Sequence, residues 1–494
     1  MQHILAIDAG TTGVTAVLFD RELRQTARAD REFAQSFPSP GRVEHAAEDI
    51  LGAVDATVAE LARHPAFASV AALGLTNQRE TIFAVERATG RALAPGIVWQ
   101  DRRTEERCRE LERSGRLDLV RRTSGLLLDP YFSATKIEWM LAHDAAIAAA
   151  HAANRVVFAT VDALVLAHLT GAQRWVTDVT NASRTMLFDL ERRAWSPELM
   201  ALFGVREDAL PRVLPSIADF GTSVPARTGG RSLPIRGVAG DQQAALFGQG
   251  GYRPGVLKAT FGTGSFLVLP TFDERVVSEG GLLTTLTPDA SGQPAFALEG
   301  STFVCGALVQ WMRDQLGLFE RAADIEALAA SVPDANGVTI VPAFAGLGAP
   351  YWDAGARGAI LGLTRGVTRA HLARAALDAI AWQNAELVEL MRQEAASDVE
   401  ALAVDGGAAA NDLLMQLCAD ASGARVLRGD DVEATARGAA LLAGLGASLW
   451  QHPDEPEAMQ QRRDSFLPRS SPDARREGLS RWRAEVRRVR TNDA

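Results

Sequence analysis

The stretch from Gly237 to Phe266, GVAGDQQAALFGQGGYRPGVLKATFGTGSF, decides the fold class of this chain. It begins with a short apolar strand that turns at Gly240, presents the carboxylate of Asp241, and continues as a helix of small residues to about Gly248. A second strand then enters a tight turn from Gly262 to Gly264. A carboxylate at the end of a strand and a glycine turn whose N–H groups can approach an anion are both parts of a phosphoryl-transfer site.

The first residues of the chain predict a third part of such a site. Ile4 to Asp20, ILAIDAGTTGVTAVLFD, reads as a β-hairpin with a Gly-Thr-Thr-Gly turn and with Asp8 just before it. Two similar hairpins, one at the start of each half, indicate a duplicated fold. We therefore expect two lobes that close on a polyphosphate from both sides.

Length and composition are those of a globular protein with two or three domains. A chain of 494 residues is too long for one hydrophobic core. Hydrophobic residues make up 47% and charged residues 23% of the chain, as in ordinary soluble proteins. No segment approaches the roughly 20 uninterrupted apolar residues of a membrane span. The N-terminus has no basic region followed by an apolar one. We expect no membrane span and a cytoplasmic location.

Charge and cysteine content argue against several kinds of partner. A formal net charge of −10 argues against nucleic acid or an anionic membrane. The three cysteines, Cys108, Cys305 and Cys418, are far apart and odd in number, so neither a disulfide framework nor a zinc motif is expected. An acidic protein can still bind ATP, because backbone amides, helix dipoles and Mg²⁺ supply a local positive field.

Polar residues follow two short apolar strands of the first half. Val70 to Leu75 runs into TNQRE at 76–80, and a strand ending at Val98 runs into WQDRR at 99–103. Ligands gather at the carboxyl ends of strands in open α/β sheets, so both clusters are candidate binding sites. A solvated turn would explain the first cluster equally well, and a tryptophan at position 99 more commonly fills a core.

In the second half, the strand from Ala401 to Asp405 runs into Gly-Gly-Ala, and Asn411 starts a further helix. Glycines between a strand and a helix N-terminus allow close approach of a flat or anionic ligand. Common nucleotide motifs are missing from the sequence. Neither lysine, Lys136 or Lys258, lies in a Walker A pattern, and position 267 lacks the third glycine of a dinucleotide fingerprint.

The order of these motifs resembles that of the actin-like ATPase and sugar-kinase superfamily, and within it the chain resembles the FGGY family of carbohydrate kinases. The narrower resemblance rests on strings unrelated to ATP, and it extends from residue 4 to about residue 445. These strings are TNQRET at 76–81, IVWQDRRT at 97–104, DPYFSATK at 129–136, TNASRTMLF at 180–188, GDQQAALFGQ at 240–249 and PAFAGLGAPYWD at 342–353.

The resemblance implies an α/β fold of two actin-like (ribonuclease H-like) lobes, each a mixed five-stranded sheet flanked by helices, with an ATP cleft between them. Residues 1–236 would form the N-terminal lobe, with the polyol site and the first phosphate hairpin. Residues 237–494 would form the C-terminal lobe, with the second hairpin and the adenosine site. The implied activity is ATP-dependent phosphorylation of glycerol to sn-glycerol 3-phosphate, and the family forms homodimers and homotetramers.

The resemblance also implies residue roles. Asp241 would act as the catalytic base, and Asp8 would position Mg²⁺, through water. The substrate-binding residues would be Arg79, Glu80, Trp99, Tyr131, Asp241, Gln242 and Phe266. The ATP-binding residues would be Thr11, Thr12, Gly13, Gly262, Thr263, Gly407 and Asn411. A triol has many polar groups and little apolar surface, so a site with fixed donors and acceptors and an aromatic wall suits it.

Two positions depart from the family pattern. Ala9 stands where glutamine is usual, and Thr15 stands where an arginine contacts the ATP phosphates, so we expect weaker ATP binding or a slower step. Two alternatives to a glycerol-phosphorylating enzyme are open. One is a related FGGY kinase acting on a pentulose or another polyol. The other is an actin-like ATP-dependent assembly or binding protein, which would leave the substrate-side strings unexplained.

Overall fold

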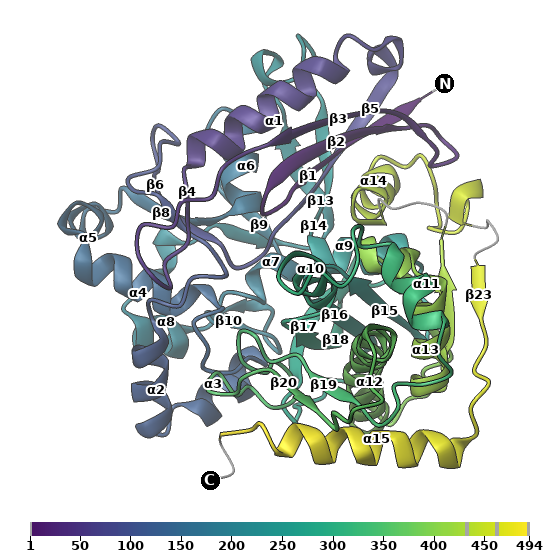
Figure 1. Cartoon of the computed structure of the whole chain (residues 1–494). Helices are drawn as coiled ribbons and strands as arrows, with labels where there is room; N and C mark the ends of the chain where they lie inside the picture. The colour runs from purple at the N-terminus through teal and green to yellow at the C-terminus, as the bar shows by residue number, and fades with distance from the viewer. Residues whose placement is uncertain (1, 430–433, 460–463, 492–494) are drawn as a thin grey trace. The chain divides into compact units, whose positions relative to one another are not determined.

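The structure, a computed structural model, describes residues 2–429, 434–459 and 464–491 (Figure 1). The chain divides into two compact units. The first contains residues 1–252, 284–296 and 433–461, and the second contains residues 253–283, 297–432 and 462–494. The sequence predicted a single boundary after residue 236, and this division of the chain differs from that prediction. The difference arises because strand β14 continues directly into helix α9, and because helix α14 packs against both of them.

A six-stranded mixed sheet is the centre of the first unit. Its strands, in spatial order, are β13 (Ile217–Thr222), β14 (Pro234–Gly240), β5 (Val70–Asn77), β1 (His3–Ala9), β2 (Gly13–Phe19) and β3 (Gln25–Glu32). Strand β5 runs parallel to both β1 and β14. In the register, Asn77 is the partner of Ala9 on one side and of Gly240 on the other. The carboxyl ends of the three strands therefore meet at one edge, which is where ligands bind in such sheets.

Alternate residues of β1 pack on opposite faces of this sheet. Leu5, Ile7 and Ala9 belong to the core that includes α1 and α6, whereas Ile4 and Ala6 belong to the core that includes α9 and α14. This period of two is what a strand buried on both faces requires. The four helices are α1 (Ala47–Leu61), α6 (Val161–Leu169), α9 (Asp241–Gly248) and α14 (Ala434–Gly446).

Helices α9 and α14 approach each other closely because glycine lies at their crossing. A Cβ atom on Gly438 would be 1.8 Å from the carbonyl oxygen of Ala244, and one on Gly74 of β5 would be 2.2 Å from that of Ala439. These distances are far below van der Waals contact, so only glycine fits at either position. The helix that begins with Asp241 is thereby held at the edge of the sheet.

A smaller four-stranded sheet also belongs to the first unit. Its order is β4 (Glu44–His45), β7 (Gly96–Ile97), β6 (Ile82–Glu86) and β8 (Val156–Thr160). The remaining helices of the first unit are α2 (Glu105–Arg113), α3 (Leu117–Ser124), α4 (Ser133–His143), α5 (Ala145–Ala152), α7 (Val179–Ala182) and α8 (Pro197–Phe203).

A seven-stranded sheet forms the centre of the second unit, and the division between the units falls within its first two strands. Its order is β17 (Leu283–Pro288), β18 (Pro294–Thr302), β16 (Ser265–Phe272), β15 (Val256–Phe261), β21 (Ala401–Asp405), β22 (Arg425–Arg428) and β23 (Asp464–Phe466). The helices of this unit are α10 (Gly306–Asp314), α11 (Asp324–Ala330), α12 (Arg369–Ala395), α13 (Asp412–Ser422) and α15 (Pro472–Arg487). Helices α12 and α13 pack together, and α15 lies against both (Figure 1).

The expected mixed α/β architecture with two sheets flanked by helices is confirmed. The expected five strands per sheet are too few, because additional strands extend the edges. Strand β13 adds an edge to the first sheet, and β17 and β23 form the two edges of the second. Within the described residues, no helix combines the length and the apolar character that crossing a membrane requires.

Candidate active site

Asp241 lies at the junction of β14 and α9. It is the first residue of the helix, and its side chain is 32% exposed. Its Oδ1 accepts a hydrogen bond of 2.7 Å from the backbone N–H of Gln242. The preceding residue, Gly240, donates its backbone N–H to the hydroxyl of Thr180 at 2.8 Å. The main chain around Asp241 is therefore anchored, while part of its carboxylate is open to solvent.

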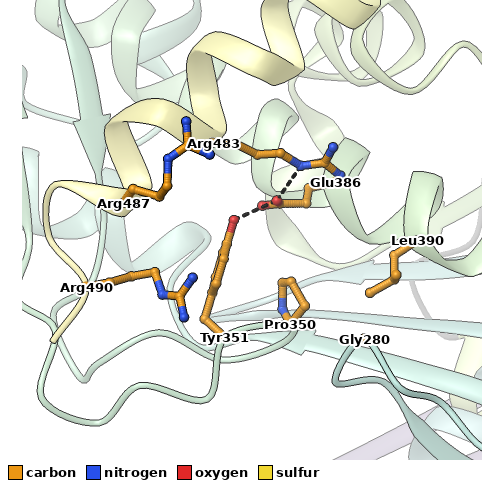
Figure 2. A pocket seen from close by; sticks show the side chains of 8 residues that line it. All are labelled: Gly280, Pro350, Tyr351, Glu386, Leu390, Arg483, Arg487 and Arg490. Carbon is orange, nitrogen blue, oxygen red and sulfur yellow. Dashed lines mark hydrogen bonds and ion pairs between the residues drawn. The ribbon is translucent and has the colours of Figure 1, made fainter. Parts of the chain in front are cut away.

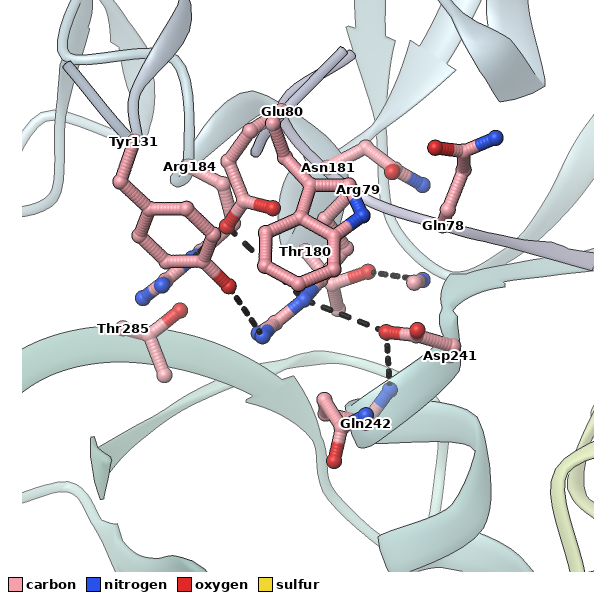
Figure 3. Close-up of polar contacts among 12 residues, drawn as sticks. Gln78, Arg79, Glu80, Tyr131, Thr180, Asn181, Arg184, Asp241, Gln242 and Thr285 are labelled. Atoms are coloured by element: carbon pink, nitrogen blue, oxygen red, sulfur yellow. Dashed lines mark hydrogen bonds and ion pairs between the residues drawn. The ribbon is translucent and has the colours of Figure 1, made fainter. Parts of the chain in front are cut away.

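Arg79 follows β5, and its guanidinium lies beside Asp241. The side chain is 2% exposed, and its Nε is 3.3 Å from Oδ1 of Asp241. Nη1 donates to Oε1 of Gln243 at 3.2 Å, and Nη2 donates to the hydroxyl of Tyr131 at 3.5 Å. Figure 3 shows the guanidinium between Tyr131 and Asp241. Because a planar guanidinium donates in fixed directions, these contacts orient the carboxylate and the phenol relative to each other.

Glu80 is held in an uncommon backbone conformation. Its φ is +61°, in the left-handed region that non-glycine residues seldom occupy. Its carboxylate is 2% exposed and lies 2.7 Å from Nε of Arg184 and 3.9 Å from Nε of Arg79. Its carbonyl accepts a hydrogen bond from the hydroxyl of Ser133 at 2.8 Å. A strained, buried acid with two cationic neighbours is typical of a functional position.

Arg184 has no role in the sequence analysis, yet it is completely buried within this cluster. Its guanidinium lies 5.6 Å from the ring centre of Tyr131 and 5.3 Å from that of Phe132, in addition to its ion pair with Glu80. A buried arginine needs such partners, because an unpaired charge in the interior is strongly unfavourable. The sequence signal for it is one arginine in the otherwise uncharged string TNASRTMLF.

Trp99 and Tyr131 form an aromatic corner beside Arg79. Their ring centres are 5.6 Å apart in an edge-to-face arrangement. Lys136 of α4 connects the segments that carry them, because its Nζ donates to the carbonyl of Val98 at 2.8 Å and to that of Tyr131 at 3.1 Å. Lys136 is completely buried, and burial lowers the pKa of its amine to about 7.

The remaining residues expected to bind substrate lie on α9 and β16. Gln242 is the second residue of α9 and is 8% exposed. Phe266 is half-buried on β16 and belongs to the second unit. Within the first unit, the structure brings six of the seven expected residues into one neighbourhood: Arg79, Glu80, Trp99, Tyr131, Asp241 and Gln242.

The turn between β1 and β2 contains the first expected phosphate-binding residues, and side chains from this neighbourhood hold it. The backbone N–H of Gly10 donates to the carbonyl of Gly13 at 2.9 Å. The indole Nε1 of Trp99 donates to Oγ1 of Thr11 at 3.0 Å, and Nε2 of Gln78 donates to the carbonyl of Gly10 at 3.0 Å. The exposed Thr12 lies at the tip of this turn.

Asp8 and the two departures from the family pattern lie on the same hairpin. Asp8 is half-buried and pairs directly with Thr15 across the two strands. Residues directly opposite in an antiparallel pair project from the same face, so position 15 is adjacent to the carboxylate. The hydroxyl of Thr15 donates to Oδ1 of Asp30 at 2.8 Å. Ala9 is completely buried in the core.

The turn between β15 and β16 is the second expected phosphate-binding turn, and it is held by main-chain contacts. The N–H of Gly262 donates to the carbonyl of Gly264 at 3.0 Å. The N–H groups of Cys305 and Gly306 donate to the carbonyls of Thr263 at 2.7 Å and of Gly262 at 2.9 Å. The side chain of Thr263 is exposed.

Gly407 and Asn411 occupy the segment between β21 and α13. Gly407 is exposed and begins a short 3₁₀ turn, which follows Gly406 at a φ of +88°. The side-chain oxygen of Asn411 accepts a hydrogen bond from the N–H of Leu414 at 2.8 Å and so caps α13. Asn411 is therefore the N-cap of α13.

The carboxylate of Asp8, before the first glycine turn, fits a magnesium ion that keeps most of its water. Within residues 2–429, 434–459 and 464–491, no group of three His, Cys, Asp or Glu side chains could hold a metal by itself. Mg²⁺ commonly binds through one or two carboxylates, with water and substrate phosphates as its other ligands. The carboxylate of Asp8, at the carboxyl end of β1 and beside a glycine turn, suits such an ion.

The fold and this arrangement define the class of protein, and comparison with known families states it directly. Residues 3–248 match the N-terminal domain of the FGGY family of carbohydrate kinases, and residues 257–447 match its C-terminal domain. The chain therefore belongs to the FGGY family of carbohydrate kinases.

Curated relatives within the family indicate a narrower group. The chain is 49% identical over 492 residues to a glycerol kinase of Aromatoleum aromaticum, an alignment that covers 99% of each chain. It is 47% identical to a glycerol kinase of Ralstonia pickettii, with the same coverage. Among solved structures, a Plasmodium falciparum glycerol kinase with ADP matches with a TM-score of 0.93 and 31% identity, covering 99% of this chain and 98% of that one.

Proposed function

We propose that this protein transfers the γ-phosphoryl group of ATP to glycerol, forming sn-glycerol 3-phosphate and ADP. The observation that carries the proposal is the buried guanidinium of Arg79, which contacts both the carboxylate of Asp241 and the hydroxyl of Tyr131. Together with Glu80 these groups offer fixed donors and acceptors within a few ångströms, on the scale of a three-carbon triol. The full-length relatives named glycerol kinase support the same substrate.

In the proposed reaction, Asp241 is the catalytic base. A terminal hydroxyl of glycerol attacks the γ-phosphorus of ATP, its proton passes to the Asp241 carboxylate, and the bond to the β-phosphate oxygen breaks to release ADP. Arg79 and Glu80 bind the other hydroxyls, and Trp99 covers the carbon face. Gln242 and Phe266 complete the proposed set of substrate contacts. Positioning and electrostatic stabilisation supply most of the rate enhancement in this kind of transfer.

The two glycine turns are the proposed phosphate-binding elements. Backbone N–H groups and hydroxyls at Thr11, Thr12, Gly13, Gly262 and Thr263 bind the β- and γ-phosphates, and Gly407 and Asn411 contact the adenosine. Asp8 would hold Mg²⁺ through water, and the ion would supply positive charge that offsets the charge of the phosphates.

A coupled assay of ADP release with a panel of polyols tests this proposal. With MgATP, we expect kcat/KM for glycerol to exceed that for erythritol, xylulose and ribulose by at least about 100-fold, because a site that hydrogen-bonds hydroxyls discriminates strongly by their position. The product should be a single enantiomer, sn-glycerol 3-phosphate. Preference for a pentulose, or ATP hydrolysis that no polyol stimulates, would contradict the proposal.

We further propose that the protein acts in the cytoplasm as a homodimer or homotetramer and binds no nucleic acid. The net charge of −10 supports the last point. Light scattering after size-exclusion chromatography measures the oligomeric state, and a monomeric mass at micromolar concentration would contradict this part of the proposal.

A further inference from the structure

The segment from Asp178 to Arg184 contributes no residue to the proposed substrate contacts, yet its side chains contact the stretches of chain that carry Asp241 and Glu80. It comprises the N-cap residue of α7, the helix itself and the two residues after it. Most of its side chains are polar and every residue is buried, so each polar group needs a partner inside the protein. Figure 3 shows three of these side chains, those of Thr180, Asn181 and Arg184.

Asp178 fixes the start of this segment. Its carboxylate caps α7 and accepts hydrogen bonds from the backbone N–H groups of Thr180 and Asn181, both at 3.0 Å. It also accepts the side-chain amide of Asn181 at 2.9 Å and the hydroxyl of Ser216 at 2.8 Å. Several donors on one buried carboxylate form a satisfied network, and such a network holds its members in one arrangement.

Thr180 connects this carboxylate to the main chain before the proposed base. Its hydroxyl donates to Oδ2 of Asp178 at 2.8 Å and accepts the backbone N–H of Gly240 at 2.8 Å. Gly240 occupies the N-cap position of α9, directly before Asp241. Because the hydroxyl both donates and accepts, its direction is fixed, and Thr180 holds the backbone from which the side chain of Asp241 extends.

Asn181 and Arg184 connect the same segment to the end of β5. The side-chain amides of Asn181 and Asn77 exchange two hydrogen bonds, at 2.9 and 3.1 Å. Asn77 is the last residue of β5, and Glu80 follows shortly after it. The Nε of Arg184 donates to Oε1 of Glu80 at 2.7 Å. Both contacts hold residues that belong to, or directly precede, the proposed binding site for the hydroxyls of glycerol.

We propose that the segment from Asp178 to Arg184 positions the polyol site, with Thr180 acting through the backbone on Asp241 and Arg184 acting through Glu80 on glycerol. Both are positioning residues, since each acts through another group. This inference rests on the proposed function and assigns to the reaction two residues that touch none of the reacting atoms.

The two residues should influence different kinetic constants. Asp241 accepts the proton only in the transition state, so a displaced base lowers kcat. Glu80 would bind hydroxyls that do not react, and its contacts are alike in the ground state and the transition state. Loss of such uniform binding raises KM and leaves kcat nearly unchanged.

Steady-state kinetics of Thr180→Val tests the first role. Valine keeps the branched shape but leaves the N–H of Gly240 without its acceptor, so kcat should fall at least about tenfold while KM for glycerol stays within about threefold. Thr180→Ser keeps the hydroxyl and should retain kcat within about threefold of the wild type. Ser216→Ala is the matched control, because it removes a hydroxyl from the same Asp178 carboxylate and leaves the acceptor of Gly240 in place. It should also keep kcat within about threefold.

Arg184→Lys tests the second role. Lysine keeps the charge but loses the planar fork of the guanidinium, so the Kd for glycerol, measured by calorimetry without ATP, and the KM should both rise at least about tenfold, with kcat within about threefold. The matched control is Arg483→Lys in the second unit, where Nε of Arg483 pairs with Oε1 of Glu386 at 2.9 Å (Figure 2). It breaks an ion pair of the same kind outside the proposed site and should leave both constants within about threefold.

If Arg184→Lys does not fold, Asn181→Ala takes its place, because it loosens the same end of β5 through Asn77. It should raise the Kd and the KM for glycerol at least about threefold.

The proposal is overturned if Thr180→Val lowers kcat no more than Ser216→Ala does, or if glycerol binding in Arg184→Lys, or in its substitute, matches that in Arg483→Lys. Equal proportional changes of kcat and KM in both variants would also overturn it, as would a lower melting temperature with unchanged kinetic constants. A wild-type protein that phosphorylates no polyol of the panel would instead refute the proposed function, so the two failures are distinguishable.

Discussion

The turn after β1 and the turn after β15 have similar sequences, but different kinds of groups hold them. Side chains of Trp99 and Gln78 bind the first turn, and both follow strands that lead to the proposed polyol site. Main-chain N–H groups at the start of α10 bind the second turn. We infer that the first turn can respond to substrate through side chains, whereas the second is a rigid main-chain cradle.

Among the tests that compare the two turns, the largest effect should come from glycine replacement in the second turn. A Cβ on Gly264 would lie 2.3 Å from the carbonyl oxygen of Thr302, whereas one on Gly262 would have its nearest neighbour at 3.7 Å. Gly264→Ala should therefore destabilise the protein by about 1–3 kcal/mol and lower kcat/KM for ATP at least about tenfold. Gly262→Ala is the matched control for stability, because a Cβ has room there, and it should change the free energy of unfolding by less than about 0.5 kcal/mol. If Gly264→Ala and Gly262→Ala changed the free energy of unfolding equally, the second turn would not be rigidly held by its main-chain contacts.

The buried amine of Lys136 should make the first region sensitive to pH. Because its pKa in the folded protein is about 7 and its ordinary value is 10.5, the unfolded chain binds a proton above pH 7 that the native protein lacks. The free energy of unfolding should therefore rise between pH 7 and pH 8.5, by at most about 1.4 kcal/mol per pH unit.

Lys136→Met should lose this slope, and it should be less stable by about 1–3 kcal/mol because the carbonyls of Val98 and Tyr131 lose their donor. Urea denaturation at several pH values measures both quantities. A variant that keeps the wild-type slope would show that another group titrates.

The hydrogen bond between Trp99 and Thr11 should couple the two ligands. Trp99→Phe and Thr11→Val each remove it, and each should raise KM for glycerol and for ATP several-fold, with a coupling energy of about 0.5–1.5 kcal/mol in the double variant. Thr263→Val in the second turn should change KM for ATP alone. If the effects of Trp99→Phe and Thr11→Val on KM were additive, this hydrogen bond would not couple glycerol to ATP. The two turns would then not differ in this respect.

The smallest change in kinetics is expected at position 15 of the first hairpin, where threonine replaces the arginine that is usual in the family. Thr15→Arg places a guanidinium on the same face as Asp8, where it can reach a phosphate, and we expect KM for ATP to fall about two- to fivefold. Gln25→Arg is a control with the same change of charge at the far end of the sheet, opposite Phe19. If Thr15→Arg left both kcat and the KM for ATP unchanged, position 15 would have no influence on the phosphates.

Local patterns predicted the parts of this structure that depend on neighbouring residues. The two hairpins and the strand–turn–helix at Asp241 are each determined by short strings, and their turns lie at the expected residues. The expectation that Arg79, Tyr131 and Asp241 serve one site came from the family resemblance, because no local rule joins positions 79, 131 and 241.

Contacts distant in sequence were not predictable in this way. The ion pair of Arg184 with Glu80 joins residues 104 positions apart. Helix α14 belongs to the first unit although about 140 residues before it belong to the second unit. Local sequence alone predicts that Asn411 caps α13, since asparagine before a helix commonly caps it, whereas its proposed contact with the nucleotide comes from the family resemblance.

The proposed base is tested most directly by glycerol 3-phosphate formation in Asp241→Asn. Asparagine keeps the size of the side chain and a carbonyl oxygen near Arg79, so the melting temperature should change little. The turnover number should fall by about 10²–10⁴, with KM for glycerol and ATP within about threefold of the wild type. An Asp241→Asn protein that forms glycerol 3-phosphate at the wild-type rate would contradict the account.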